Sequence, residues 1–139
     1  MENIENKISF PVICFYGFLL RIRTDRDDLV ITTTAGVKNG MFDNMLVVGV
    51  DGKAVRVKSA RKLQGIGFLW GFNPMVGRRI KVELLYDGEP FVMSVDEVRS
   101  KVLNSFEKWH GWKTREDYDE LKASVEKAVS IEEIIRLVK

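Results

Sequence analysis

The sequence predicts an α+β protein in which six to eight short strands, forming a small curled antiparallel sheet or an SH3-like β-barrel, precede three C-terminal helices. Two observations indicate this class. Apolar residues alternate with a period of two in short runs up to about residue 93, and from residue 94 they recur at helical spacing. We therefore expect one domain over 1–139, with a β portion at 8–93 and a helical portion at 94–139.

The apolar run at 8–20 carries no charge, but its 13 residues are fewer than the ~18–20 that a membrane helix needs, and it contains Pro11 and Gly17. Its aromatic and β-branched residues instead predict two strands, near 8–15 and 18–24. A polar turn at 24–28 and a further strand at 29–33 would then make 18–33 a hairpin. We expect no membrane span.

The stretch at 44–59 is the clearest hairpin, because Asp51 and Gly52 separate two apolar runs. A two-residue turn needs positive φ at both central positions, which Asp and Gly tolerate. The cross-strand pairs predicted from such a turn are Val48 with Val55 and Leu46 with Val57. One face of this hairpin would then be core.

Further strands are predicted on either side of a glycine-rich segment. Part of 64–77 alternates large residues with glycine, and 78–86 places Ile80, Val82 and Leu84 on one face. After a turn at 87–90, residues 91–93 return as a last strand.

The C-terminal third carries two capping boxes, in which a Ser is followed three residues later by a Glu. Ser94 and Glu97 predict a helix from about Val95 to Lys108, which Gly111 would end. Ser130 and Glu133 predict a last helix, and Thr114 is expected to open the one between them.

The reactive residues are few and argue against an enzyme. The one histidine, His110, falls at a predicted helix end, and the one cysteine, Cys14, falls in an apolar strand that suggests an inert thiol in a reducing compartment. Zinc needs about four N or S ligands, and the acidic clusters at 25–28 and 116–120 do not have the pattern of a calcium loop. We expect no catalytic residue, no metal and no cofactor.

Charge is distributed unevenly along the chain. Residues 53–81 hold eight Lys or Arg and no Asp or Glu, although the formal net charge of the protein is only +2. The flanks are acidic, with five Lys or Arg against seven Asp or Glu in 1–52 and nine against thirteen in 82–139. Cations interleaved with aromatic residues are typical of a surface that meets a negatively charged partner.

The expected partner-binding residues are Arg56, Lys58, Arg61, Lys62, Phe68, Trp70, Phe72, Arg78, Arg79 and Lys81. They predict a small, cytoplasmic, non-enzymatic accessory module that engages an acidic protein or peptide. Single-stranded nucleic acid is the alternative partner, with cations following phosphates and aromatics stacking on bases. Two simpler interpretations compete: the aromatics form a buried strand face, or the acidic C-terminal helices lie across the basic segment and neutralise it.

Overall fold

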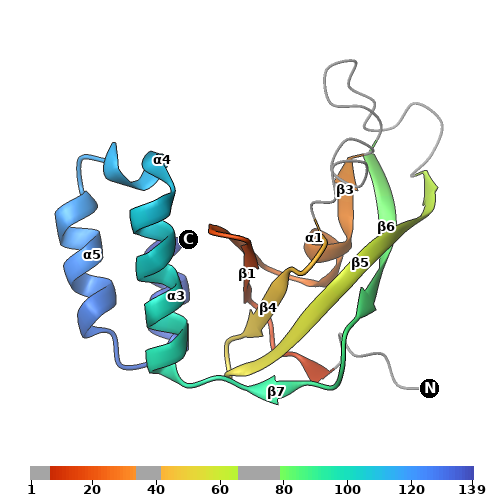
Figure 1. The fold of residues 1–139 in the computed structure, drawn as a ribbon, viewed down its shortest axis with the longest axis horizontal. Coiled ribbons are helices and arrows are strands. Elements are labelled where there is room, and N and C mark those ends of the chain that lie inside the picture. The colour runs from red at the N-terminus through yellow and green to blue at the C-terminus, as the bar shows by residue number, and fades with distance from the viewer. Residues whose placement is uncertain (1–6, 34–41, 66–78) are drawn as a thin grey trace.

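A computed structural model describes residues 7–33, 42–65 and 79–139, in which an antiparallel sheet is followed by C-terminal helices (Figure 1). The strands are β1 (Val12–Tyr16), β2 (Leu19–Arg23), β3 (Ile31–Thr33), β4 (Leu46–Gly49), β5 (Lys53–Gly65), β6 (Arg79–Tyr86) and β7 (Phe91–Val92). The helices are α1 (Arg26–Val30), α3 (Val95–Lys108), α4 (His110–Lys113), α5 (Tyr118–Lys127) and α6 (Ile131–Val138). The predicted α+β class with three longer C-terminal helices, α3, α5 and α6, is confirmed.

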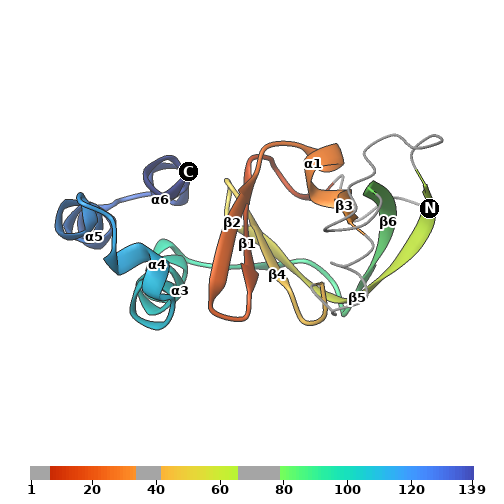
Figure 2. The same cartoon turned by 90° about the horizontal axis from the view of Figure 1, so that it is seen from above.

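The strands lie in the order β2-β1-β4-β5-β6-β3, and β7 pairs with the start of β5. Within the described residues, the two ends of this order, β2 and β3, do not pair with each other. The sheet is therefore open, and the alternative of a closed SH3-like barrel is wrong for this part of the chain. Figure 2 shows how the open sheet curls between its two ends.

The segment at 18–33 is not the predicted hairpin. Strands β1 and β2 form as expected, but α1 follows β2, and β3 pairs with β6 instead. The reason is local, because the acidic residues expected to form a turn start a helix: the Asp25 carboxylate accepts from the Asp28 amide at 2.8 Å, and the Asp28 carboxylate accepts from the Thr24 amide at 3.0 Å.

The central hairpin forms, but its predicted register is wrong by one residue. Val47 lies opposite Val55, and Val48 lies opposite Ala54. The Gly52 amide donates to the Gly49 carbonyl at 3.0 Å, and Gly52 alone carries the positive φ, of 91°, that was expected of Asp51 as well. The loop is thus one residue longer than a two-residue turn, and a slip of one residue moves every side chain to the other face.

Both faces of the central strands are buried, where the hairpin pattern predicts one core face. One face packs on the C-terminal helices and forms what we call the helix-side core, which includes Ile13, Phe15, Leu20, Leu46, Val48, Ala54, Val98, Val102, Phe106 and Ile134. The other lines the inside of the curl, under α1, and forms the concave core, which includes Val12, Cys14, Leu29, Val30, Val47, Val55, Val57, Val82 and Leu84 (Figure 2).

Strand β5 joins the two halves of the sheet. Its first residues pair with β4 and β7, and from Val57 onward it pairs with β6. Register shifts at Val57/Ser59 and Lys62/Gln64 interrupt its pairing with β6, and such bulges bend a strand and increase its twist. On β6, Val82 and Leu84 face the concave core, as the alternation predicts.

The capping boxes place two of the helices correctly. Ser94 and Glu97 exchange both bonds of the box at the start of α3. At α6 the Ser130 hydroxyl accepts from the Glu133 amide, but the Glu133 carboxylate accepts from the amide of Val129. None of the helices in the described ranges is both long and apolar enough to cross a bilayer.

The middle helix forms, but its predicted start is wrong. Thr114 does not open a helix but ends the short α4, where its hydroxyl donates to the Gly111 carbonyl at 2.9 Å. Gly111 lies inside α4 and does not end α3. Helix α5 begins four residues after Thr114, at Tyr118.

Substitution of Gly52 tests the corrected hairpin. At φ +91° an added Cβ would be strained and would lie 3.0 Å from the Met93 carbonyl oxygen, whereas at Gly88, with φ +84°, nothing lies within 4 Å. Gly88→Ala should therefore lower the free energy of unfolding by about 1 kcal/mol through backbone strain, and Gly52→Ala by clearly more. Urea denaturation of both variants measures this difference, and equal midpoints would contradict the close approach of β7 to the turn.

Candidate functional site

Four of the ten predicted partner-binding residues have described side chains: Arg56, Lys58, Arg61 and Lys81. Lys62 and Arg79 belong to strands β5 and β6, but their side chains are outside the described part of the structure. The other four predicted residues, Phe68, Trp70, Phe72 and Arg78, lie outside the described residues altogether, as does the question of whether the aromatics are core.

The β5–β6 half of the sheet turns one face away from the concave core. Cross-strand pairs on this outward face are Ser59 with Leu85 and Arg61 with Glu83, and Lys81 follows Glu83 at the next position of the same parity. The pair between them, Ala60 and Leu84, points the other way. We call Lys58, Arg61, Lys81, Glu83 and Leu85 the β5–β6 face.

The cations of this region differ in what they contact. Arg61 forms an ion pair with Glu83, in which its Nε donates to the carboxylate at 2.7 Å. Arg56 donates through a terminal guanidinium nitrogen to the Asn44 carbonyl at 3.2 Å, so its cation helps to hold the entry to β4. Lys58 is exposed and Lys81 half-buried, and within the described residues neither has an ion-pair partner.

The acidic helices do not neutralise these cations. Figure 1 shows α3, α4 and α5 on the side of β1, and Figure 2 shows α6 with them and β2 facing them, with β5 and β6 extending away from the helices in both views. The helices instead hold ion pairs of their own, such as Glu107 with Lys113 at 3.5 Å and with Lys122 at 3.8 Å. Among the described residues, the interpretation that the helices lie across the basic segment is therefore wrong.

The buried polar groups form a structural cluster inside the curl. Cys14 is fully buried, and burial raises the pKa of its thiol to about 12. Burial also raises the pKa of Tyr16 to about 12, and the Tyr16 hydroxyl accepts from Arg23 at 3.3 Å. Arg23 in turn pairs with Asp28 at 3.5 Å. A thiol that stays protonated at neutral pH is a poor nucleophile and metal ligand.

Other reactive residues are scattered. His110 is exposed on the short helix α4. Within residues 7–33, 42–65 and 79–139, no group of three or more His, Cys, Asp or Glu lies close enough to hold a metal ion.

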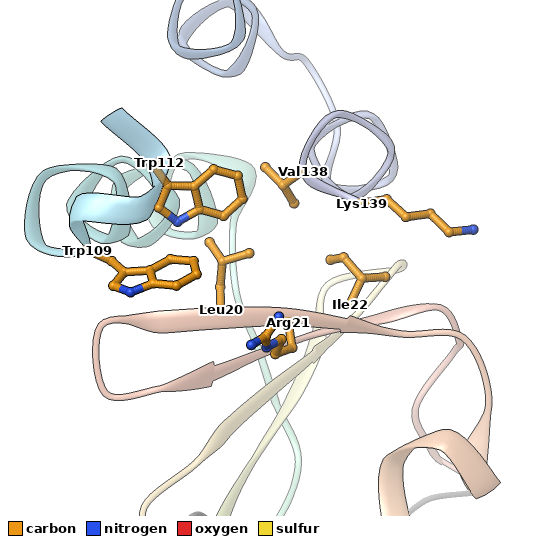
Figure 3. A pocket seen from close by; sticks show the side chains of 7 residues that line it. All are labelled: Leu20, Arg21, Ile22, Trp109, Trp112, Val138 and Lys139. Atoms are coloured by element: carbon orange, nitrogen blue, oxygen red, sulfur yellow. The ribbon is translucent and has the colours of Figure 1, made fainter. Parts of the chain in front are cut away.

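A pocket that the sequence did not indicate lies between the sheet and the helices (Figure 3). It has a volume of about 260 Å³. From β2 it is lined by Leu20, Arg21 and Ile22, and from the helical side by Trp109, Trp112, Val138 and Lys139. The signal that could have pointed to it is the pair of tryptophans in the sequence WHGW, which directly follows the predicted helix ending near Lys108.

The two tryptophans form a packed aromatic wall. Their rings meet edge to face, with centroids 6.0 Å apart and planes at 84°, and Trp112 also packs on Phe106 at 4.8 Å. The Trp112 indole nitrogen is buried and has no hydrogen-bond partner among the described residues. In Figure 3 this nitrogen lies on the edge of the ring that faces Trp109, an arrangement in which an N–H can point at a π face.

Thiol labelling tests the burial of Cys14. At about pH 8, where a free thiol is partly ionised, the native protein should react with an aromatic disulfide reagent far more slowly than after unfolding in guanidinium, because the buried thiol is both protonated and inaccessible. A Phe18→Cys variant, at an exposed turn position, supplies the accessible control. Equal rates for the two cysteines in the native protein would contradict the buried cluster.

Comparisons with protein-family models, with curated proteins and with solved structures each found no match. Function therefore has to be argued from the charges, exposures and contacts of the residues themselves. Two surfaces stand out on those grounds, the cationic β5–β6 face and the pocket beside β2.

Proposed function

We propose that this protein is a small, non-enzymatic binding module that engages an acidic protein or peptide through the β5–β6 face. The observation that supports this most directly is the position of the cations. Lys58, Arg61 and Lys81 lie on the half of the sheet that the acidic helices leave uncovered. Their charge is therefore available to a partner.

The Arg61–Glu83 ion pair does not remove this availability. Its side chains are 66% and 41% exposed, and pairs at such exposure contribute only ~0–1 kcal/mol because water competes for both groups. A partner carboxylate can replace Glu83 at little cost. At Lys58 and Lys81 a partner carboxylate has no described ion pair to displace.

The composition of the β5–β6 face favours a protein partner over nucleic acid. Single-stranded nucleic acids bind where aromatic side chains stack on bases. Among the described side chains of β5 and β6, the single aromatic is Tyr86, which packs against the concave core. The β5–β6 face instead offers Leu85, which is 39% exposed, as an apolar contact beside the cations, a combination found in protein interfaces.

A charge-reversal experiment tests the proposal. A Lys58→Glu, Lys81→Glu variant should bind a labelled poly-glutamate peptide about tenfold more weakly than the wild type at low salt, because attraction is replaced by repulsion. A Lys108→Glu, Lys127→Glu variant carries the same change in net charge on exposed helical positions and should bind as the wild type does. Fluorescence anisotropy measures both.

The same assay separates the possible partners. Poly-glutamate binding that is absent from the wild type, or that falls equally in both variants, would contradict the proposal. Tighter binding of a labelled oligothymidylate, with log affinity falling against log salt at a slope of about −3 for roughly four phosphates, would replace the acidic protein with single-stranded nucleic acid.

A further inference from the structure

Strand β2 ends the sheet and leaves one backbone edge unpaired. In the described residues it pairs with β1 alone, and the next element along the chain, β3, joins the far end of the sheet. An edge strand presents a row of N–H and C=O groups that can pair with another extended chain.

The pocket lies against this edge strand, between β2 and the helices. Leu20, Arg21 and Ile22 all line it although they are consecutive. Side chains of successive strand residues point to opposite faces, so a pocket bordered by three in a row also borders the backbone of the strand. Figure 3 shows Leu20 and Ile22 pointing from β2 toward the helices, with Arg21 between them.

We propose that an extended peptide segment of a partner adds to β2 as a further strand, placing one large apolar side chain in the pocket and acidic side chains at the alternate positions. This site lies at the opposite end of the sheet from the β5–β6 face and does not depend on the function proposed there. The recognition mode combines main-chain hydrogen bonds with a pocket for alternate side chains.

The size and walls of the pocket indicate its occupant. At about 260 Å³ it is smaller than the ~300–1,000 Å³ of sites for drug-sized ligands, which suits a single side chain held by its own backbone. Leu20, Ile22, Trp109, Trp112 and Val138 make its walls apolar. An aromatic or large aliphatic residue fits these walls.

The charge on β2 favours acidic residues on either side of the apolar residue in the added strand. Arg21 is exposed, and within the described residues it has no ion-pair partner, unlike Arg23, which is held by Asp28 and Tyr16. In an added strand, residues flanking the apolar one point to the opposite face of β2, which is where alternation places the side chain of Arg21.

A capped heptapeptide of alternating glutamate and valine, with phenylalanine replacing the central valine, is the probe. Titrated into the ¹⁵N-labelled protein, it should shift the backbone amides of Leu19–Arg23 and the indole signals of Trp109 and Trp112. Replacing its phenylalanine with alanine should weaken binding about tenfold, because the pocket then stays unfilled. Shifts confined to the β5–β6 face would overturn the inference.

Backbone methylation of the probe tests strand addition without altering the protein. An added strand directs the N–H groups of alternate residues to β2 and the others to solvent. Of two probes, one N-methylated on the glutamates and one on the apolar residues, one should therefore lose binding about tenfold or more and the other should keep it. Equal affinities of the two would exclude a strand.

Protein variants complete the test. Arg21→Glu should weaken the affinity read from the Leu19–Arg23 amides about fivefold, whereas Lys127→Glu and the Lys58→Glu, Lys81→Glu variant should not change that affinity, so that failure at one surface is distinguishable from failure at the other. Sedimentation equilibrium of the free protein examines a competing occupant. A dimer that Arg21→Glu dissociates would show that a second copy of this chain pairs with β2, and would overturn the inference.

Discussion

The burial of both faces of β1 and β4 is the constraint on which the rest of the structure depends. Val12, Ile13, Cys14, Val47 and Val48 are each fully buried, although neighbours along a strand point to opposite faces. Such strands need an apolar cover on each side. The C-terminal helices supply one cover, and the curl of the sheet, closed by α1, supplies the other.

As a result, the C-terminal helices do not cover the outward face of β5 and β6. The helices pack over β1, β2 and β4, while β5 bends away at its bulges and continues with β6 beyond their reach. From Val57 onward, the described apolar side chains of β5 and β6 point inward, with the exception of Leu85, and the other outward positions can carry charge. The helices therefore do not cover the cationic face of β5 and β6, because these strands bend away from them.

The same packing creates the pocket at the other end. Helices α4 and α6 approach β2 from the helix-side core, but β2 is the last strand, so nothing in the described residues continues the sheet beneath them. Trp109, which precedes α4, and Trp112, which lies inside it, therefore stand over the edge strand β2. Apolar walls next to an edge strand are what distinguish this place from an ordinary gap between a helix and a sheet.

Local chemistry by itself determined the elements whose signals lie within a few residues: the α+β class, the helix starts at Ser94 and Ser130, and the alternating face of β6. Local signals did not determine which strands pair or in which register. The register of the hairpin depends on one extra loop residue next to Gly52. Strand β3 pairs with β6 because a short capped helix changes the direction of the chain after β2. The pocket joins residues from 20 to 139, and only tertiary packing brings together side chains so far apart in sequence.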